Sequence, residues 1–139
     1  MGRIMALDFG QKRCGIAVTD PLQMIANGLT TVASNQVIDY ILDYLKTEEV
    51  AVIVVGQPRD MQNNASDASR FIEPFVGRLR NAIPEKVKIE RYDERFTSKI
   101  AFQSMIDAGL GKKKRQDKAL VDTISATLIL QAYMRSKNR

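Results

Sequence analysis

The strongest restriction on the fold comes from six consecutive apolar residues, Val50–Val55. All of them except Ala51 are β-branched, and the run ends at Gly56, which favours a strand over a short helix. A strand without a polar position on either face is typical of the centre of a sheet that helices cover on both sides. The run therefore predicts an α/β fold with a covered sheet.

The flanking segments predict the remaining elements. Further strands are expected at residues 4–8, 14–19, 29–33 and 87–92, with the Gly10–Arg13 turn joining the first two as a hairpin. Apolar residues at helical spacing predict four helices: from the N-cap Ser34, from Ser66 through a kink at Pro74, from Thr97 or Ser98 to Ala108, and from Asp117 to Arg135. This order gives a mixed five-stranded sheet with helices on both faces. At 139 residues without a linker, a single domain over residues 1–139 is expected.

The residues that the sequence lacks restrict the chemistry. There is no histidine and Cys14 is the single cysteine, which excludes Ser-His-Asp triads, zinc-thiolate clusters and an intrachain disulfide. Metal binding would then depend on carboxylates, which suit Mg²⁺ or Mn²⁺. The net charge of +5 favours a polyanionic partner, although a merely solvated basic surface explains it equally well. With no apolar run of membrane-spanning length and no signal sequence, we expect a cytoplasmic protein.

Three places along the chain carry acidic residues suited to catalysis. Asp8 ends the first strand beside Gly10, where backbone can approach a phosphate, unless it merely initiates the turn. Asp93 and Glu94 follow the fifth strand. If the first and fifth strands are parallel, these two acids lie at the same edge of the sheet as Asp8. The alternative is that they form a salt bridge within a loop. Asp122 lies in the second turn of the most apolar helix, where its charge needs a metal or an ion-pair partner. Converging carboxylates of this kind are what two-metal phosphoryl transfer requires.

Basic residues accompany these acids. They are Lys12 and Arg13 after Asp8, Arg95 after the acidic pair, and Lys112, Lys113, Lys114 and Arg115 before the last helix. Clusters of this kind bind phosphates without reading sequence and in a salt-dependent way. For residues 112–115 taken alone, a flexible solvated loop is the simpler reading. We predict that the basic residues contact a nucleic-acid backbone.

Several motifs occur in an order that covers nearly the whole chain. They are Ala6-Leu7-Asp8-Phe9-Gly10, Lys12-Arg13, Gly15-Ile16-Ala17-Val18, Thr19-Asp20-Pro21, Val54-Val55-Gly56, Asp93-Glu94-Arg95-Phe96-Thr97 and Lys118 to Leu130. Together they resemble the YqgF/RuvX family of RNase H-like nucleases. The resemblance implies an RNase H-like fold and a Mg²⁺-type site with catalytic Asp8, Asp93, Glu94 and Asp122, of which Asp8, Glu94 and Asp122 would bind the metal. Many other RNase H-like nucleases have an acid where this chain has Gly56, so the choice between Asp93 and Glu94 stays open.

The family is described either as processing the 5′ end of precursor 16S ribosomal RNA or as a Holliday junction resolvase. We favour structured RNA over branched DNA, because paired cuts on a junction require two symmetric sites and the sequence has no apolar stripe beyond its core helices. The same argument slightly favours a monomer. A non-catalytic RNA-binding factor for ribosome assembly is a further alternative. An ATPase of the actin and sugar-kinase type would need a second lobe, which 139 residues do not provide.

Overall fold

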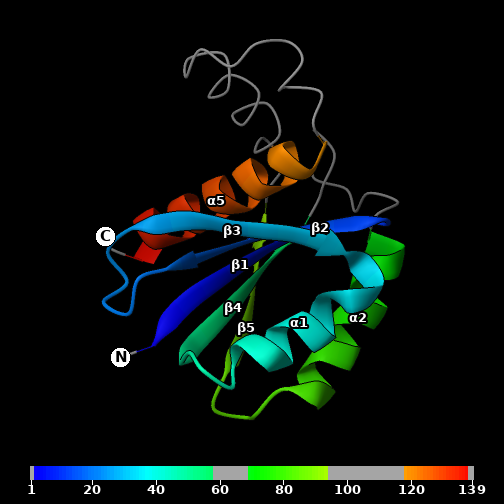
Figure 1. The fold of residues 1–139 in the computed structure, drawn as a ribbon, viewed down its shortest axis with the longest axis horizontal. Coiled ribbons are helices and arrows are strands. Elements are labelled where there is room, and N and C mark those ends of the chain that lie inside the picture. Colours follow the sequence, from blue (N-terminus) through cyan, green and yellow to red (C-terminus); the bar gives the residue numbers. More distant parts are fainter. Residues whose placement is uncertain (1, 58–68, 94–117, 138–139) are drawn as a thin grey trace.

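A computed structural model describes residues 2–57, 69–93 and 118–137 of the chain. Its centre is a five-stranded sheet in the order β3-β2-β1-β4-β5 (Figure 1). The strands are β1 (Arg3–Phe9), β2 (Arg13–Thr19), β3 (Ala26–Ala33), β4 (Val50–Gln57) and β5 (Lys88–Asp93). The β1–β2 and β2–β3 pairs are antiparallel, and the β1–β4 and β4–β5 pairs are parallel. The predicted mixed sheet is confirmed, and β1 and β5 run in the same direction.

Helices cover both faces of the sheet (Figure 1). Helix α5 (Lys118–Lys137) crosses one face, while α1 (Val37–Tyr44) and α2 (Ser69–Ala82) lie on the other. Helix α2 continues through Pro74, as the apolar spacing predicted. The helix expected at Thr97 or Ser98 lies outside the described residues, as does the proposed cap Asp117.

The expected role of Ser34 as an N-cap is wrong. Ser34 opens the short 3₁₀ helix η1 (Ser34–Gln36), and the N-cap positions of η1 and α1 make no side-chain cap hydrogen bond. Its hydroxyl instead donates to the carbonyl oxygen of Gly10 at 2.6 Å, and its N–H donates to the carbonyl of Lys12. Ser34 therefore fixes the β1–β2 turn rather than a helix end.

The two faces of the sheet are packed by residues of different size. On the α1/α2 face, strand residues such as Met5, Leu7 and Ile53 meet Phe75 and Leu79 of α2 in a large apolar core. On the α5 face two of the four buried strand residues are alanines. The cluster there consists of Ile4, Ala6, Ala17, Val54, Ala126, Ile129, Leu130 and Tyr133. The Val50–Val55 strand supplies residues to both cores, so its predicted burial on two sides is confirmed. Among the described helices, none combines the length and apolarity needed to cross a bilayer.

Candidate active site at the Asp8 end of the sheet

Asp8 occupies a position that the strand pattern would otherwise fill with an apolar residue. Side chains alternate along β1, so that Ile4 and Ala6 join the α5-side core while Met5 and Leu7 join the other. Asp8 is the next residue in the series of Ile4 and Ala6, and it is half-buried at the end of the strand. The carboxylate therefore lies at the edge of the α5-side core and not in a free turn.

Gly15 lets α5 come close enough to Asp8 to form a site. Gly15 is paired with Asp8 across the β1–β2 ladder. A Cβ atom added to Gly15 would overlap the backbone carbonyl group of Asp122 in α5. At Gly28 of β3, an added Cβ would lie 2.6 Å from the Thr123 side chain. Two glycines on neighbouring strands thus form the surface against which the Asp122 turn of the helix rests.

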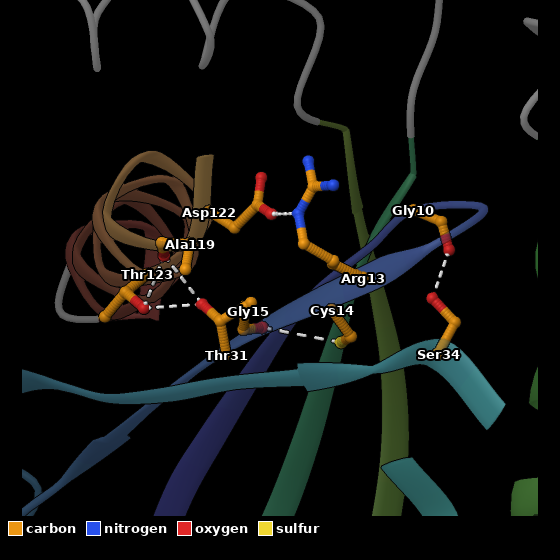
Figure 2. A network of polar contacts seen from close by, with 9 residues as sticks. All are labelled: Gly10, Arg13, Cys14, Gly15, Thr31, Ser34, Ala119, Asp122 and Thr123. Atoms are coloured by element: carbon orange, nitrogen blue, oxygen red, sulfur yellow. Dashed lines mark hydrogen bonds and ion pairs between the residues drawn. The ribbon is translucent and has the colours of Figure 1, made fainter. Parts of the chain in front are cut away.

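Hydrogen bonds hold the same turn of α5 on the sheet (Figure 2). The hydroxyl of Thr31 on β3 donates to the carbonyl of Ala119 at 2.7 Å and lies 2.7 Å from the Thr123 hydroxyl. Ser125 and Ala126 are buried, as expected of small residues that allow a close approach. Asp122 is therefore carried on a helical turn whose position is set by backbone contact and by side-chain hydrogen bonds.

Arg13 is the ion-pair partner of Asp122. Its Nε donates to the Asp122 carboxylate at 2.8 Å (Figure 2), across 109 positions of sequence. The Asp122 side chain is 22% exposed and that of Arg13 is 37% exposed, so the pair is open to solvent on one side. The ion pair that the sequence left as an alternative for Asp122 is thus present. Arg13 was predicted to contact nucleic acid, and here it lies at the carboxylates themselves.

Two carboxylates converge at this end of the sheet. The pKa of Asp8 is raised from 3.8 to about 6, first because burial disfavours its charged form and second because the negative charge of Asp122 lies nearby. A hydrogen bond with the Ser125 side chain acts in the opposite direction. The desolvated Asp8 carboxylate and the Asp122 carboxylate, which is paired with Arg13, offer oxygen donors close to one another. Such a set fits a hard divalent cation.

A shallow pocket of about 340 Å³ opens above these groups. Its lining is Asp8, Gly10, Gln11, Lys12, Arg13 and Asp122. The turn that forms one wall is closed by a 2.8 Å hydrogen bond from the Gly10 N–H to the Arg13 carbonyl. Lys12 is exposed on this turn. The pocket combines acids for a cation with basic groups for a phosphate.

The remaining predicted residues are only partly described. Asp93 ends β5, and its backbone pairs with Gln57 at the same edge of the sheet as Asp8. Glu94, Arg95 and residues 112–115 lie outside the described residues. Within the part of the chain that is described, no group of three or more Asp, Glu, Cys or His side chains could hold a metal ion. The structure thus brings together two of the expected metal ligands, Asp8 and Asp122.

Sequence reasoning missed two contributors to the site. Gly15 was noted only as part of a motif, because its importance depends on which helix crosses β2 at that point. Ser125 was noted only for its small size, although its side chain hydrogen-bonds with Asp8. Its position three residues after Asp122, on the same helix face, was the available signal.

Solved structures share this architecture. Thermus thermophilus RuvC, solved in complex with a Holliday junction substrate, superposes with a TM-score of 0.60 at 16% identity, covering 99% of this chain and 97% of that one. The fowlpox virus Holliday junction resolvase gives a TM-score of 0.55 at 15% identity, covering 96% and 99%. Likeness at these identities is evidence of fold. The chain therefore has the RNase H-like α/β fold that its sequence led us to expect.

Sequence comparison identifies the family. The model described as "RuvX: Holliday junction resolvase" matches residues 2–136. A relative from Phocaeicola vulgatus named "Putative pre-16S rRNA nuclease" is 57% identical over 137 residues, 99% of this chain and 98% of the relative. A Flavobacterium psychrophilum relative of the same name is 53% identical and covers 99% of each chain. The chain belongs to the RuvX family, as its motifs indicated.

Proposed function

We propose that this protein is a nuclease of one RNase H-like domain that hydrolyses phosphodiester bonds in structured nucleic acid. One observation carries the proposal: Gly15 allows α5 to bring Asp122 beside Asp8, which places two carboxylates at the mouth of a pocket lined by Lys12 and Arg13. A purely structural ion pair would not require the second, desolvated acid. Membership of the RuvX family and the nuclease names of its relatives support the same activity.

The residues fit a divalent cation, Mg²⁺ or Mn²⁺. Asp8 and Asp122 would hold it, because hard cations prefer carboxylate oxygens. A bound cation would also offset the burial and the Asp122 charge that together raise the pKa of Asp8. When bound, the ion would supply Lewis-acid polarisation of the phosphodiester and activation of water. The carboxylates themselves contribute fixed positions on two rigid elements, a strand end and a helix.

Either Asp93 or Glu94 would complete the donor set, and we propose Glu94 as the metal ligand. Along β5, Glu90 hydrogen-bonds with Tyr133 of α5 and Tyr92 packs against the α5-side core. Continuation of the two-residue period beyond Asp93, where β5 ends, would make Glu94 the next residue in that series. Asp93 stays a catalytic candidate, since the end of β5 shares an edge with Asp8.

The basic residues would bind the phosphate backbone. Arg13 uses Nε to hold Asp122, which leaves its two terminal nitrogens available for a phosphate oxygen. Lys12 is exposed on the same turn and would add a second positive charge. Arg95 and residues 112–115 are proposed to extend this path. Contacts of this kind hold the substrate without reading its sequence.

We propose structured RNA, the 5′ region of precursor 16S ribosomal RNA, as the substrate, with the cytoplasm as the place of action. The relatives at 57% and 53% identity are named for that precursor. A four-way DNA junction is the second candidate, favoured by the family description and by the RuvC-like fold. A non-catalytic assembly factor would retain the basic groups but would not need Asp8 beside Asp122.

A cleavage assay with two substrates tests the proposal. Purified protein with Mg²⁺ or Mn²⁺ is offered a precursor 16S 5′ fragment and, separately, a four-way DNA junction. We expect cleavage of the RNA, at least ~100-fold slower in the Asp8→Asn and Asp122→Asn variants, because each removes a carboxylate that acts in the reaction. Asp43→Asn, an exposed acid of α1, is the matched control and should cleave normally.

Each alternative has its own result in this assay. Symmetric cleavage of the junction without cleavage of the RNA would favour the resolvase. Tight RNA binding without cleavage at any metal concentration would favour the assembly factor. Wild-type turnover by Asp122→Asn would overturn the proposed site.

A further inference from the structure

A charge-free segment follows β2 and begins at the end of the sheet opposite Asp8. Residues Pro21–Ile38 include no Asp, Glu, Lys or Arg, although 27% of the chain is charged. The segment includes the β2–β3 loop and the whole of β3. All the large apolar side chains that are exposed in the described residues belong to it: Leu22, Met24, Ile25 and Leu29. We call these four residues the apolar patch.

The loop that carries most of the patch is held rigidly. The carboxylate of Asp20 accepts hydrogen bonds from three following backbone N–H groups, those of Leu22, Met24 and Ile25. Gln23 has a left-handed φ of 59°, a conformation that costs a non-glycine residue about 1 kcal/mol or more. Its side-chain amide donates to the Gly2 carbonyl at 2.6 Å and so holds the loop against β1. Leu22, Met24 and Ile25 are each 64–69% exposed on this fixed backbone.

Fixed display of apolar groups is a feature of docking sites. A solvated loop gains nothing from exposing three large apolar side chains, whereas a preorganised loop loses little conformational entropy when a partner covers it. The strained φ of Gln23 supports the same reading, since strain persists where surrounding contacts impose it.

The surface around the apolar patch has both a protruding side chain and a groove. The groove, of about 400 Å³, lies between the loop and the C-terminal part of α5 and is lined by Met24, Ile25, Ala26, Gln131, Met134 and Arg135. Leu22 is not part of its lining and is 65% exposed. One surface therefore offers an exposed apolar side chain and a depression, lined in part by Met24, Ile25 and Met134, that could receive one.

The adjoining strand β3 is an edge strand of the described sheet. Among residues 2–57, 69–93 and 118–137 it pairs only with β2, at the end of the sheet order. Its sequence, residues 26–33, has neither the charges nor the proline that usually protect edge strands from pairing. A register shift leaves Leu29 without a partner on β2, and this bulge is the protective feature that β3 retains.

We propose that the apolar patch and the adjoining β3 edge contact a second copy of this chain across a two-fold axis. A two-fold contact sets a surface against itself, so any charge would face a like charge; residues 21–38 have none. Arg135 lines the groove and Asp20 anchors the loop, and the charges of these two residues have opposite signs. Leu22 of each copy and the groove of the other give the reciprocal fit that such an interface requires. A nucleic acid would instead require basic groups.

Leu22, Met24 and Ile25 lie at the end of the sheet away from Asp8, so contact through this loop leaves the candidate active site of each copy open. It also replaces the preference for a monomer drawn from the sequence. That preference assumed that no exposed apolar stripe exists beyond the core helices, and the exposed apolar patch contradicts the assumption. The sequence-based reason for favouring RNA over a four-way junction therefore no longer holds. The proposed substrate depends on the names of the relatives alone.

Sedimentation equilibrium over a wide concentration series tests the proposal. The wild-type chain should shift from 15.6 kDa towards twice that mass as the concentration rises. The Leu22→Lys/Met24→Lys variant should weaken dimerisation by at least about tenfold, because it buries two unpaired charges. Both side chains are more than 60% exposed, so the fold should survive, which circular dichroism checks. Asn81→Lys on the exposed face of α2 is the matched control and should dimerise normally.

Cross-linking locates the contact independently. An equimolar mixture of the Leu22→Cys and Gln131→Cys proteins should form a mixed disulfide-linked dimer under mild oxidation, because Leu22 of one copy enters the groove of the other. A mixture of the Asn81→Cys and Gln131→Cys proteins should not; the native Cys14 is buried. A wild-type protein that stays monomeric at every concentration overturns the proposal and leaves the patch to a different protein. A dimer that the double lysine variant leaves intact overturns it as well, because the contact would then lie elsewhere.

Discussion

The two faces of the sheet show how one chain separates stability from chemistry. On the α1/α2 face, large side chains interdigitate; Phe9 and Phe75, for example, stack with ring centroids 4.0 Å apart. On the α5 face, Gly15, Gly28 and Ala126 replace such side chains, and the helix backbone rests almost directly on the strands. Large side chains hold a helix away from a sheet, whereas glycine lets it approach closely. Only the second arrangement can bring a helix carboxylate beside a strand carboxylate.

The largest effect on stability is expected on the α1/α2 face. Phe75 is 1% exposed, so Phe75→Ala leaves a cavity and should lower the free energy of unfolding by about 3–5 kcal/mol. Cleavage per folded molecule should stay near the wild-type value, because the α5 face is unchanged. Urea denaturation and an assay at a temperature where the variant is folded measure the two quantities. Loss of activity in the folded variant would show that the two faces are not separable.

A smaller loss of stability with a much larger loss of activity is expected for Gly15→Ala. The new methyl group would overlap the Asp122 backbone, so α5 must move away at a cost of about 1–3 kcal/mol. The displacement separates Asp122 from Asp8, and cleavage should fall by at least about tenfold. Gly77→Ala in α2 is the matched control, since its Cβ meets no atom within 4 Å and should stabilise the helix by roughly 0.5–1 kcal/mol. Normal cleavage by Gly15→Ala would contradict the role of close approach.

The smallest effect is a gain in stability from Asp8→Asn, and it depends on pH. The pKa of Asp8 in the folded protein is raised to about 6, so the folded state holds this proton more tightly than the unfolded chain does. Its contribution to stability is therefore fully present below pH 4 and is lost as the pH rises to 6. At pH 7 without metal, the variant should be more stable than wild type by about 1–3 kcal/mol. Denaturation of both proteins at pH 4 and pH 7 should show a difference in the free energy of unfolding at pH 7 alone. Equal differences at both pH values would show that the fold does not disfavour the charged form of Asp8.

Local sequence patterns sufficed for most of the fold and for the two central acids. The β-branched run at Val50–Val55 predicted a central strand, and a charged residue deep in an apolar helix marked Asp122. The start of β3 was expected at Leu29 but lies at Ala26, because Gly28 faces a helix and breaks the alternation. The alternation of apolar and polar residues was the only sequence signal for the start of this strand. A glycine placed for close approach of a helix interrupts that alternation.

Features that depend on distant contacts could not be predicted. The Arg13–Asp122 ion pair joins residues 109 positions apart, and the role of Gly15 follows only once α5 is known to cross β2. The exposure of Leu22, Met24 and Ile25 could not be predicted either, because apolar residues next to a strand are usually buried. Their exposure follows from the hydrogen bonds of Asp20, which fix the loop outside the sheet.

Binding of Mn²⁺ by calorimetry at pH 7 tests the central claim most directly, because it requires no knowledge of the substrate. If the close approach of α5 builds a metal site from Asp8 and Asp122, the wild-type protein should bind Mn²⁺. Asp8→Asn, Asp122→Asn and Gly15→Ala should each weaken binding by at least about tenfold. The exposed-acid control Asp43→Asn should bind as wild type does. Undiminished binding by both Asp8→Asn and Asp122→Asn would contradict the account.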